Sequence, residues 1–405
     1  MTNVGARRGG LALGALALAA AFATGSSAFA VAGVGFLLAG AVTWLWTWFA
    51  ERPVRVALTV HPHALTEGDR ARIEVEIERG SRILSGSISA KTTIGRLGAR
   101  STALRAEGRR ASGEIDLGEV SRGVYAVTGT QVLLGDLLGL VSVSPTVVCD
   151  PATLTVRPRL VALDGLFSDA GRQGGAGRRV LLRRTAGFDL HSVREYEQGE
   201  SLRRVHWPTS ARRGQLMVKE LEDAAQDGVV VVLDCDPTGA VGRPPGSSFD
   251  VAVRAAGSLV QAHAAQGRTV TLVCTGRGRT PVSVRSAAGD LNAVVNELAA
   301  AEPDAPHGVG RFLGGAERAL AGGGELVVVT ATVEQQAFAA LLALSARRLV
   351  SVVWIDAASF AVRPTRAEPG LLRLSAHGVP TAVVRRGEDL VTALSAPRLE
   401  AAARG

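Results

Sequence analysis

The chain has 405 residues, a formal net charge of +8 and three cysteines. This length supports two or three domains, because a single hydrophobic core stops growing at roughly 250–300 residues. The cysteines, Cys149, Cys235 and Cys274, are too few and too scattered for a disulfide scaffold or a cysteine metal site, so we interpret them as reduced structural thiols. The positive charge suits both an anionic membrane surface and a nucleic acid, and does not decide between them.

Residues 1–52 predict a transmembrane helical hairpin. No charged residue occurs from Gly9 to Ala50, which is about two bilayer spans of roughly 20 residues each. The polar sequence Thr24–Ser27 divides this stretch into Gly9–Ala23 and Ala28–Ala50. Aromatic residues of the kind that lie at a headgroup interface close the second helix: Trp44, Trp46, Trp48 and Phe49.

Basic residues flank the hairpin at both ends: Arg7, Arg8, Arg52 and Arg55. Because such residues prefer the cytoplasmic side, we expect both ends and the soluble body to be cytoplasmic. The alternative is a signal peptide, with the apolar core Leu11–Ala23 and a small-residue cleavage site at residues 28–30. Cleavage would leave residues 31–50 as a single span with the same preferred orientation.

Residues 53–157 alternate between polar and apolar side chains, as half-buried strands do. The clearest example is Arg72–Glu78. Four further segments follow the same pattern: Val56–Val60, Gly113–Leu117, Tyr125–Thr128 and Thr153–Val156. Several short strands in about 100 residues, with no helical pattern between them, predict a β-sandwich of immunoglobulin-like size.

Residues 158–228 contain a linker and then a segment of mixed charge. Gly171–Arg179 is glycine-rich and basic, but it lacks the Gly-Lys-Ser/Thr ending of a phosphate-binding loop. We therefore interpret it as a flexible loop.

Residues 229–405 alternate between apolar strands and helices. The predicted strands are Val229–Leu233, Thr269–Cys274, Glu325–Thr330, Val350–Ile355 and Pro380–Val384. The predicted helices between them include Asp250–Gln266, Leu291–Ala300 and Glu334–Arg347. Wholly apolar strands that alternate with helices predict a doubly wound α/β domain, in which a parallel sheet is covered on both faces.

The strongest motif begins at Arg194 and reads R-E-Y-E-Q-G-E-S-L-R-R-V-H-W-P-T-S-A-R. It resembles the signature R-x-Y-x-x-G-D-x-x-R-x-I-x-W-x-x-x-A-R of the domain of unknown function 58 family. The residues that carry this resemblance are Arg194, Tyr196, Gly199, Arg203, His206, Trp207, Ala211 and Arg212. Glu200 stands where Asp is commoner, and Pro208 stands where a basic residue is usual.

The resemblance extends upstream and downstream of the signature. Arg122–Tyr125 followed by Gly135–Leu140 is similar to an R-G-x-Y…D-P-x-G-L-F element of the family, with Leu137 in place of Pro and hence a looser turn. Downstream, the resemblance implies that residues 229–405 form a von Willebrand factor type A-like domain.

The signature segment has three interpretations. Its arginines, with Tyr196 and Trp207, would suit a nucleic-acid surface, but glutamates lie between them and would repel phosphates. A structural interpretation pairs Arg194 and Arg203 with these glutamates and has Trp207 fill the joint with the following sheet. A third makes the segment a docking surface, since exposed Arg, Trp and Tyr dominate interface hot spots. We favour the second and third together, and consider nucleic acid the weaker candidate.

The first strand of the α/β domain ends at Asp234, which precedes Asp236 and Thr238. In metal-binding type A domains this loop reads D-x-S-x-S, and its oxygen ligands suit Mg²⁺. A later strand ends in Thr330-Ala331-Thr332, where such domains usually offer T-D-G. We therefore favour turn capping by the two aspartates and no cofactor, with a degenerate Mg²⁺ site as the alternative.

No sequence motif of a nucleophilic or metal-dependent enzyme occurs. His191, Ser192 and His206 are close in sequence, but such closeness does not make a catalytic triad. Members of the resembled family are commonly associated with MoxR-type AAA+ ATPases. The resemblance thus implies a membrane-anchored, cytoplasm-facing, non-enzymatic adaptor that presents its α/β domain to such an ATPase or to a client protein. The alternative is a basic surface that binds nucleic acid or anionic lipid.

Overall fold

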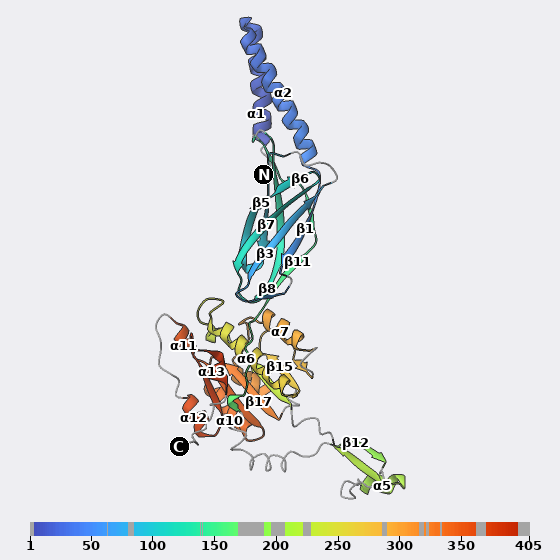
Figure 1. Ribbon diagram of the computed structural model, residues 1–405, viewed down its shortest axis with the longest axis vertical. Coiled ribbons are helices and arrows are strands. Elements are labelled where there is room, and N and C mark those ends of the chain that lie inside the picture. The colour runs from blue at the N-terminus through green and yellow to red at the C-terminus, as the bar shows by residue number, and fades with distance from the viewer. Residues whose placement is uncertain are drawn as a thin grey trace, which may run out of the picture. The chain divides into compact units, whose positions relative to one another are not determined.

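The protein is a mixed α/β chain that begins with apolar helices and contains several sheets (Figure 1). The computed structural model describes residues 4–62, 64–79, 85–137, 139, 141–168, 190–195, 207–221, 228–285, 290–315, 320, 324–332, 334–361 and 370–395. The chain divides into two compact units, Met1–Val156 and Arg157–Gly405. The predicted linker Gly171–Arg179 lies outside the described residues.

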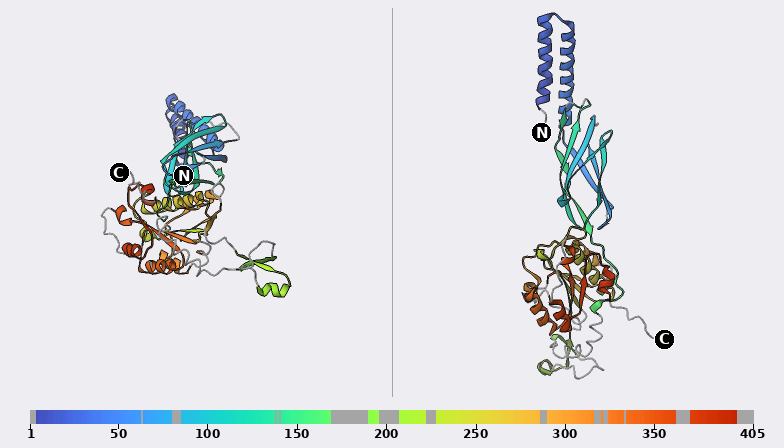
Figure 2. Two further views of the ribbon diagram at one scale, coloured as in Figure 1. Left: turned by 60° about the horizontal axis from the view of Figure 1, so that its bottom comes forward. Right: turned by 90° about the vertical axis from the view of Figure 1, so that its left-hand side faces the viewer.

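Two apolar helices, α1 (Val4–Thr24) and α2 (Ser27–Ala50), run antiparallel side by side (Figure 2). They pack closely because glycines face leucines across the pair: a Cβ added at Gly33 would lie 2.9 Å from the backbone nitrogen of Leu18. Gly25, with φ of 63°, makes the turn between them at the predicted polar break. Among the described helices, α2 is the one long and apolar enough to cross a bilayer, and α1 contains only the shorter apolar stretch Ala12–Thr24.

Side chains from outside the helices cover the end of α2. Arg79 donates through Nη2 to the carbonyl oxygens of Phe49 and Ala50, the latter at 3.0 Å. These carbonyls lie in the last turn of the helix, where the regular hydrogen bonds of the helix end. The Arg52 guanidinium lies 5.1 Å from the ring centroid of Trp48 and 4.9 Å from that of Phe49. The predicted aromatic belt therefore has cationic partners at its end.

Two sheets follow within the first unit. Their strands are β1 (Val54–His61), β2 (Leu65–Thr66), β3 (Arg70–Glu78), β4 (Ser87–Ile94), β5 (Gly98–Ala103), β6 (Arg105–Glu107), β7 (Arg110–Glu119), β8 (Gly123–Gly135), β9 (Ser142–Val143), β10 (Val147–Cys149) and β11 (Ala152–Arg157). One sheet has the order β10-β1-β3-β7-β6, and the other has the order β2-β11-β8-β4-β5, with β9 paired to β8. A single turn of 3₁₀ helix, η1 (Gly95–Leu97), separates β4 from β5.

Both sheets contribute to one hydrophobic core, as the alternating sequence predicts. In β3, the apolar side chains of Ile73, Val75 and Ile77 are buried, whereas the charged residues between them are exposed or half-buried. Leu134 of β8 and Leu154 of β11 belong to the same cluster.

The element Arg122–Tyr125 stabilises this core. Tyr125 is 1% exposed, and its hydroxyl donates to the Ser121 carbonyl oxygen at 2.7 Å. Further along β8, Asp136 closes the next turn by accepting from the backbone N–H of Val141 at 3.1 Å. The buried Asp136 carboxylate thus closes the turn with a hydrogen bond, next to Leu137, which replaces the proline of the family element.

A six-stranded sheet dominates the second unit, in the order β16-β15-β14-β17-β18-β19. Its strands are β14 (Val229–Leu233), β15 (Val270–Cys274), β16 (Val282–Val284), β17 (Glu325–Thr330), β18 (Leu349–Ile355) and β19 (Thr381–Val384). Neighbouring strands are parallel except for the edge strand β16, which the sequence pattern did not predict. The helical segments around it are η4 (Pro237–Gly239), α6 (Ser248–Ala265), α7 (Leu291–Ala300), α8 (Val309–Gly315), α10 (Gln335–Ser345), α11 (Ala357–Phe360), α12 (Gly370–Ala376) and α13 (Leu390–Leu394).

Helices cover this sheet on both faces because β14 is apolar throughout. Val231 faces a core that includes Val253 of α6 and Leu298 of α7. Val232 faces a second core that includes Leu341 of α10 and Leu374 of α12. The predicted parallel sheet with two covered faces is present.

A buried ion pair ties β17 to the loop before β15. Glu325, 2% exposed at its side chain, accepts from Arg268 Nη1 at 2.7 Å, and the same Nη1 lies 3.0 Å from His263 Nδ1. Such a pair adds little over an apolar replacement, but removing one partner leaves an uncompensated buried charge.

We therefore expect Arg268→Ala to lower the free energy of unfolding by about 3–5 kcal/mol. The double variant Arg268→Leu/Glu325→Leu should regain most of that loss, because neither charge remains buried. Urea unfolding of the full chain in detergent measures both values. Equal losses in the single and double variants would contradict the ion-pair explanation.

Candidate functional site

The strand order of the α/β unit reverses at the carboxyl ends of β14 and β17, and we call the region outside these strand ends the crevice. From β14 the chain moves to β15 on one side, and later returns to β17 on the other. Ligands of open α/β sheets bind where the strand order reverses in this way. Asp234 follows β14 at this point, and its backbone N–H donates to the Val329 carbonyl oxygen of β17 at 2.9 Å.

The Asp234 carboxylate is 5% exposed and is held by three donors. Its Oδ2 accepts from the hydroxyls of Thr330 at 2.7 Å and Thr332 at 3.3 Å, and its Oδ1 accepts from the backbone N–H of Asp236 at 3.1 Å. Burial raises the pKa of Asp234 to about 6, although the hydrogen bond from Thr330 favours the charged form.

The Asp236 carboxylate has a different task. Its Oδ1 accepts from the backbone N–H of Thr238 at 2.9 Å and from the Thr238 hydroxyl at 2.8 Å, and so caps η4. Its Oδ2 faces Gly308, as does Glu334: a Cβ added at Gly308 would lie 3.3 Å from Asp236 Oδ2 and 3.6 Å from Glu334 Oε2. The glycine therefore leaves room for two carboxylates on one side of the crevice.

These residues offer a weak fit to a divalent cation. Within the described ranges, no group of three His, Cys, Asp or Glu side chains is arranged to hold a metal ion. Asp234, Asp236, Thr238, Thr330 and Thr332 do supply hard oxygen atoms, which suit Mg²⁺. However, three hydrogen bonds from the protein already occupy most of the roughly four lone pairs of the Asp234 carboxylate, and this leaves one position, on Oδ1, for a cation.

Two cysteines that are far apart in sequence meet beside this crevice. Cys235 and Cys274 are 0% and 5% exposed, and both belong to the core. The hydrogen bond with Cys235, and then burial, raise the pKa of the Cys274 thiol. Both are free thiols, and their apolar surroundings fit a structural role, but nothing in the sequence indicates that they lie side by side.

The signature segment contains a strand, a helix and a second strand. Strand β12 (Leu190–Glu195) pairs antiparallel with β13 (Met217–Leu221), with Arg194 opposite Val218, and α5 (Trp207–Arg213) lies between them in sequence. The Ser210 hydroxyl accepts from the backbone N–H of Met217 at 2.8 Å, which fastens α5 to β13.

The described signature residues of α5 are open to solvent. The Trp207 side chain is 62% exposed, and Ala211, Arg212 and Arg213 are exposed as well. Four further signature residues lie outside the described residues: Tyr196, Gly199, Arg203 and His206.

Comparison with known proteins agrees with the motif. Residues 192–359 match the model of the family described as protein of unknown function DUF58. The chain is also 24% identical over 197 residues to the uncharacterized protein YeaD of Bacillus subtilis (strain 168), across 49% of this chain and 47% of that relative. The match thus spans about half of the relative's length.

Two solved structures share little with the chain. A type I cohesin of ScaB from Pseudobacteroides cellulosolvens has a TM-score of 0.17 at 9% identity, over 27% of this chain and 94% of that one. Cwp6 from Clostridium difficile has a TM-score of 0.16 at 8% identity, over 74% of this chain and 37% of that one. TM-scores this low carry no inference about fold or function.

The raised pKa of Asp234 predicts a pH-dependent stability. Because the folded-state pKa of about 6 lies above the ordinary 3.8, the folded protein binds this proton more tightly than the unfolded chain does. The protonated carboxyl contributes up to about 3 kcal/mol to the free energy of unfolding. This contribution is complete below about pH 4 and is lost as the pH rises through about 6.

Asp234→Asn should remove that dependence, because the amide does not ionise. We expect its free energy of unfolding to vary less between about pH 4 and pH 7 than that of the native chain, by up to about 3 kcal/mol. Urea unfolding across this range tests the prediction. Parallel curves for the two proteins would show that Asp234 is not the responsible group.

We further expect removal of divalent cations to leave stability unchanged, since Asp234 is already satisfied by protein donors. If the folded protein bound Mg²⁺, a Mg²⁺ concentration a hundredfold above the Kd would add about 2.7 kcal/mol to the free energy of unfolding. Thermal unfolding of the full chain in EDTA and in excess Mg²⁺ distinguishes the two cases. A higher melting temperature in Mg²⁺ that disappears in Asp236→Asn would establish a metal site.

Proposed function

We propose that this protein is a membrane-anchored, cytoplasm-facing, non-enzymatic adaptor that docks a MoxR-type AAA+ ATPase and a client protein. In this proposal the two apolar helices form a transmembrane hairpin, the paired sheets of the first unit form a β-sandwich, and the second unit is a von Willebrand factor type A-like domain. The exposed surface of α5 is the docking element.

The observation that carries the proposal is the exposure of Trp207. An indole that is 62% exposed on a short helix, followed by exposed Arg212 and Arg213, combines the residue types that are most enriched in interface hot spots. The bond from Met217 to Ser210 anchors this helix on β13, so that little order has to be gained on binding.

The crevice at Asp234 supports a role without catalysis. A general acid or base must reach a substrate proton, but Asp234 is buried and satisfied by Thr330, Thr332 and Asp236. Asp236 is engaged in capping η4. The carboxylates thus shape the loops that a partner would contact.

Two further features support the membrane tether and its orientation. Helix α2 has the length and composition of a bilayer span. Arg52 follows it and stacks on Trp48 and Phe49, as expected for a basic residue at the cytoplasmic interface. The choice of ATPase rests on the family that the signature resembles, and on the match of residues 192–359 to that family's model.

We expect Trp207→Ala to weaken binding to a purified MoxR-type ATPase from the same organism by about 2 kcal/mol, or roughly thirtyfold. The measurement is surface capture of the full-length protein in detergent, with ATPase titrated in the presence of ATP. Leu133→Ala, which removes another exposed apolar side chain from β8, is the matched control and should bind normally.

Two results would reject the proposal. One is a native protein that binds no MoxR-type ATPase, or binds it equally well after the Trp207 substitution. The other is retention of nucleic acid or anionic lipid, with an affinity that falls steeply with salt and depends on Arg212 and Arg213. The second result would favour the charge-based alternative.

A further inference from the structure

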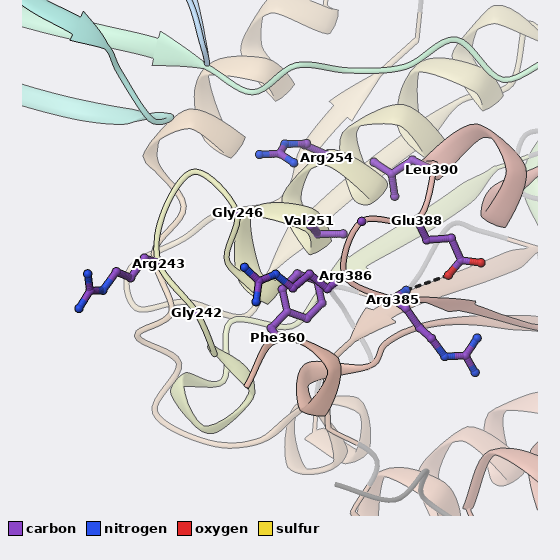
Figure 3. A pocket seen from close by; sticks show the side chains of 11 residues that line it. Gly242, Arg243, Gly246, Val251, Arg254, Phe360, Arg385, Arg386, Glu388 and Leu390 are labelled. Carbon is purple, nitrogen blue, oxygen red and sulfur yellow. Dashed lines mark hydrogen bonds between the residues drawn. The ribbon is translucent and has the colours of Figure 1, made fainter. Parts of the chain in front are cut away.

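An arginine-lined cavity of about 670 Å³ lies in the second unit, away from the Asp234 crevice (Figure 3). Four arginines and one glutamate line it: Arg243, Arg254, Arg385, Arg386 and Glu388. Its volume falls in the range of small-molecule sites, roughly 300–1,000 Å³. The excess of positive charge indicates an anionic ligand.

The fold places these residues together from separate loops. Arg385 and Arg386 directly follow β19, Phe360 ends α11 after β18, and Arg254 lies on α6. Loops after parallel strands line the ligand sites of α/β sheets. The cavity therefore lies at the edge of the sheet where such ligands bind.

Arg386 is the best candidate for direct contact. Its backbone N–H donates to the Ser359 hydroxyl at 2.9 Å, which fixes the residue, and its guanidinium has no partner among the described residues. In Figure 3 this side chain lies beside Phe360 and extends toward the loop that carries Gly242 and Gly246.

Two of the other three arginines are more engaged. Arg254 donates to the carbonyl oxygen of Pro245, and Arg385 Nε lies 3.6 Å from Asp356 Oδ2. Glu388 accepts from the backbone N–H of Arg385 at 3.0 Å, which directs this carboxylate to its own loop. Charge opposite Arg386 is thus left for a ligand to supply.

Backbone N–H groups at the start of α6 are not the source of anion affinity. The hydroxyl of Ser247 accepts from the Asp250 N–H at 3.1 Å, and the Asp250 carboxylate accepts from the Ser247 N–H in turn. This capping box already satisfies the helix end. Recognition falls to guanidinium groups, whose planar fork matches the oxygens of a phosphate.

We propose that this cavity binds a small phosphorylated ligand, with its phosphate on Arg386 and Arg254 and its less polar part against Phe360. The site is independent of the α5 docking surface, and the adaptor proposal can fail without affecting it. The guanidiniums would recognise a phosphate from either of two sources, a ligand free in solution or a lipid headgroup.

The test uses the full chain in phosphatidylcholine nanodiscs and inorganic pyrophosphate, titrated by calorimetry at low salt. Arg386→Glu should weaken binding roughly tenfold or more, because it replaces an attraction with a repulsion. Arg386→Met should weaken it less. Arg347→Ala removes an exposed arginine of the same unit outside the cavity and should leave the affinity unchanged.

Arg386 is exposed, so these variants should fold, and equal thermal unfolding of all four proteins verifies this. No pyrophosphate binding by the native chain, or equal losses in the Arg386 and Arg347 variants, would overturn the proposal. Monomeric dihexanoylphosphatidylglycerol then identifies the source. Displacement of pyrophosphate by this lipid supports a headgroup ligand, and failure to displace it supports a free phosphorylated ligand.

Discussion

The loops of the second unit are held by one buried carboxylate, that of Asp234. It lies at the ends of two parallel strands, where the strand order of the sheet reverses. Asp234 joins β14 to the end of β17 and to the loop after it through the hydroxyls of Thr330 and Thr332. Burial of this carboxylate is unfavourable, and its pKa of about 6 records that cost. The hydrogen bonds offset part of it, and in return they fix both loops in one arrangement. Any surface built from these loops inherits that order.

The same edge of the sheet carries opposite charges in two places. Asp236 and Glu334 face Gly308 near the reversal point, whereas arginines surround the cavity after β18 and β19. Parallel topology explains this arrangement, because it brings every strand's carboxyl end, and the polar loop that follows, to one edge. The net charge of +8 alone suggests a uniformly basic surface. Separate acidic and basic patches along one edge instead suit specific recognition, because complementary patches select the right partner and repel wrong ones.

The sequence predicted the elements of this unit better than its sites. Val229–Leu233 and Leu291–Ala300 were predicted with the bounds that the structure has, because a wholly apolar run and a helical period each have one favourable solution. Other features depend on contacts between distant segments. Neither the meeting of Cys235 with Cys274 nor the position of Arg386 leaves a periodic trace, and β16 is too short to show one. At the signature, the sequence alone could not predict the exposure of Trp207, because a tryptophan in a mixed-charge segment fits a buried position at a domain joint equally well.

One loop connects the crevice with the cavity. It runs from Asp236 through η4 to the start of α6. Within it, the Ser248 hydroxyl donates to the Gly239 carbonyl oxygen at 2.7 Å and accepts from the Val241 N–H at 2.7 Å. Asp236 borders the crevice, whereas Gly242 and Gly246 line the cavity. If a partner contacts the crevice loops, the two binding events share one structural element, and thermodynamic linkage makes any effect of one on the other reciprocal.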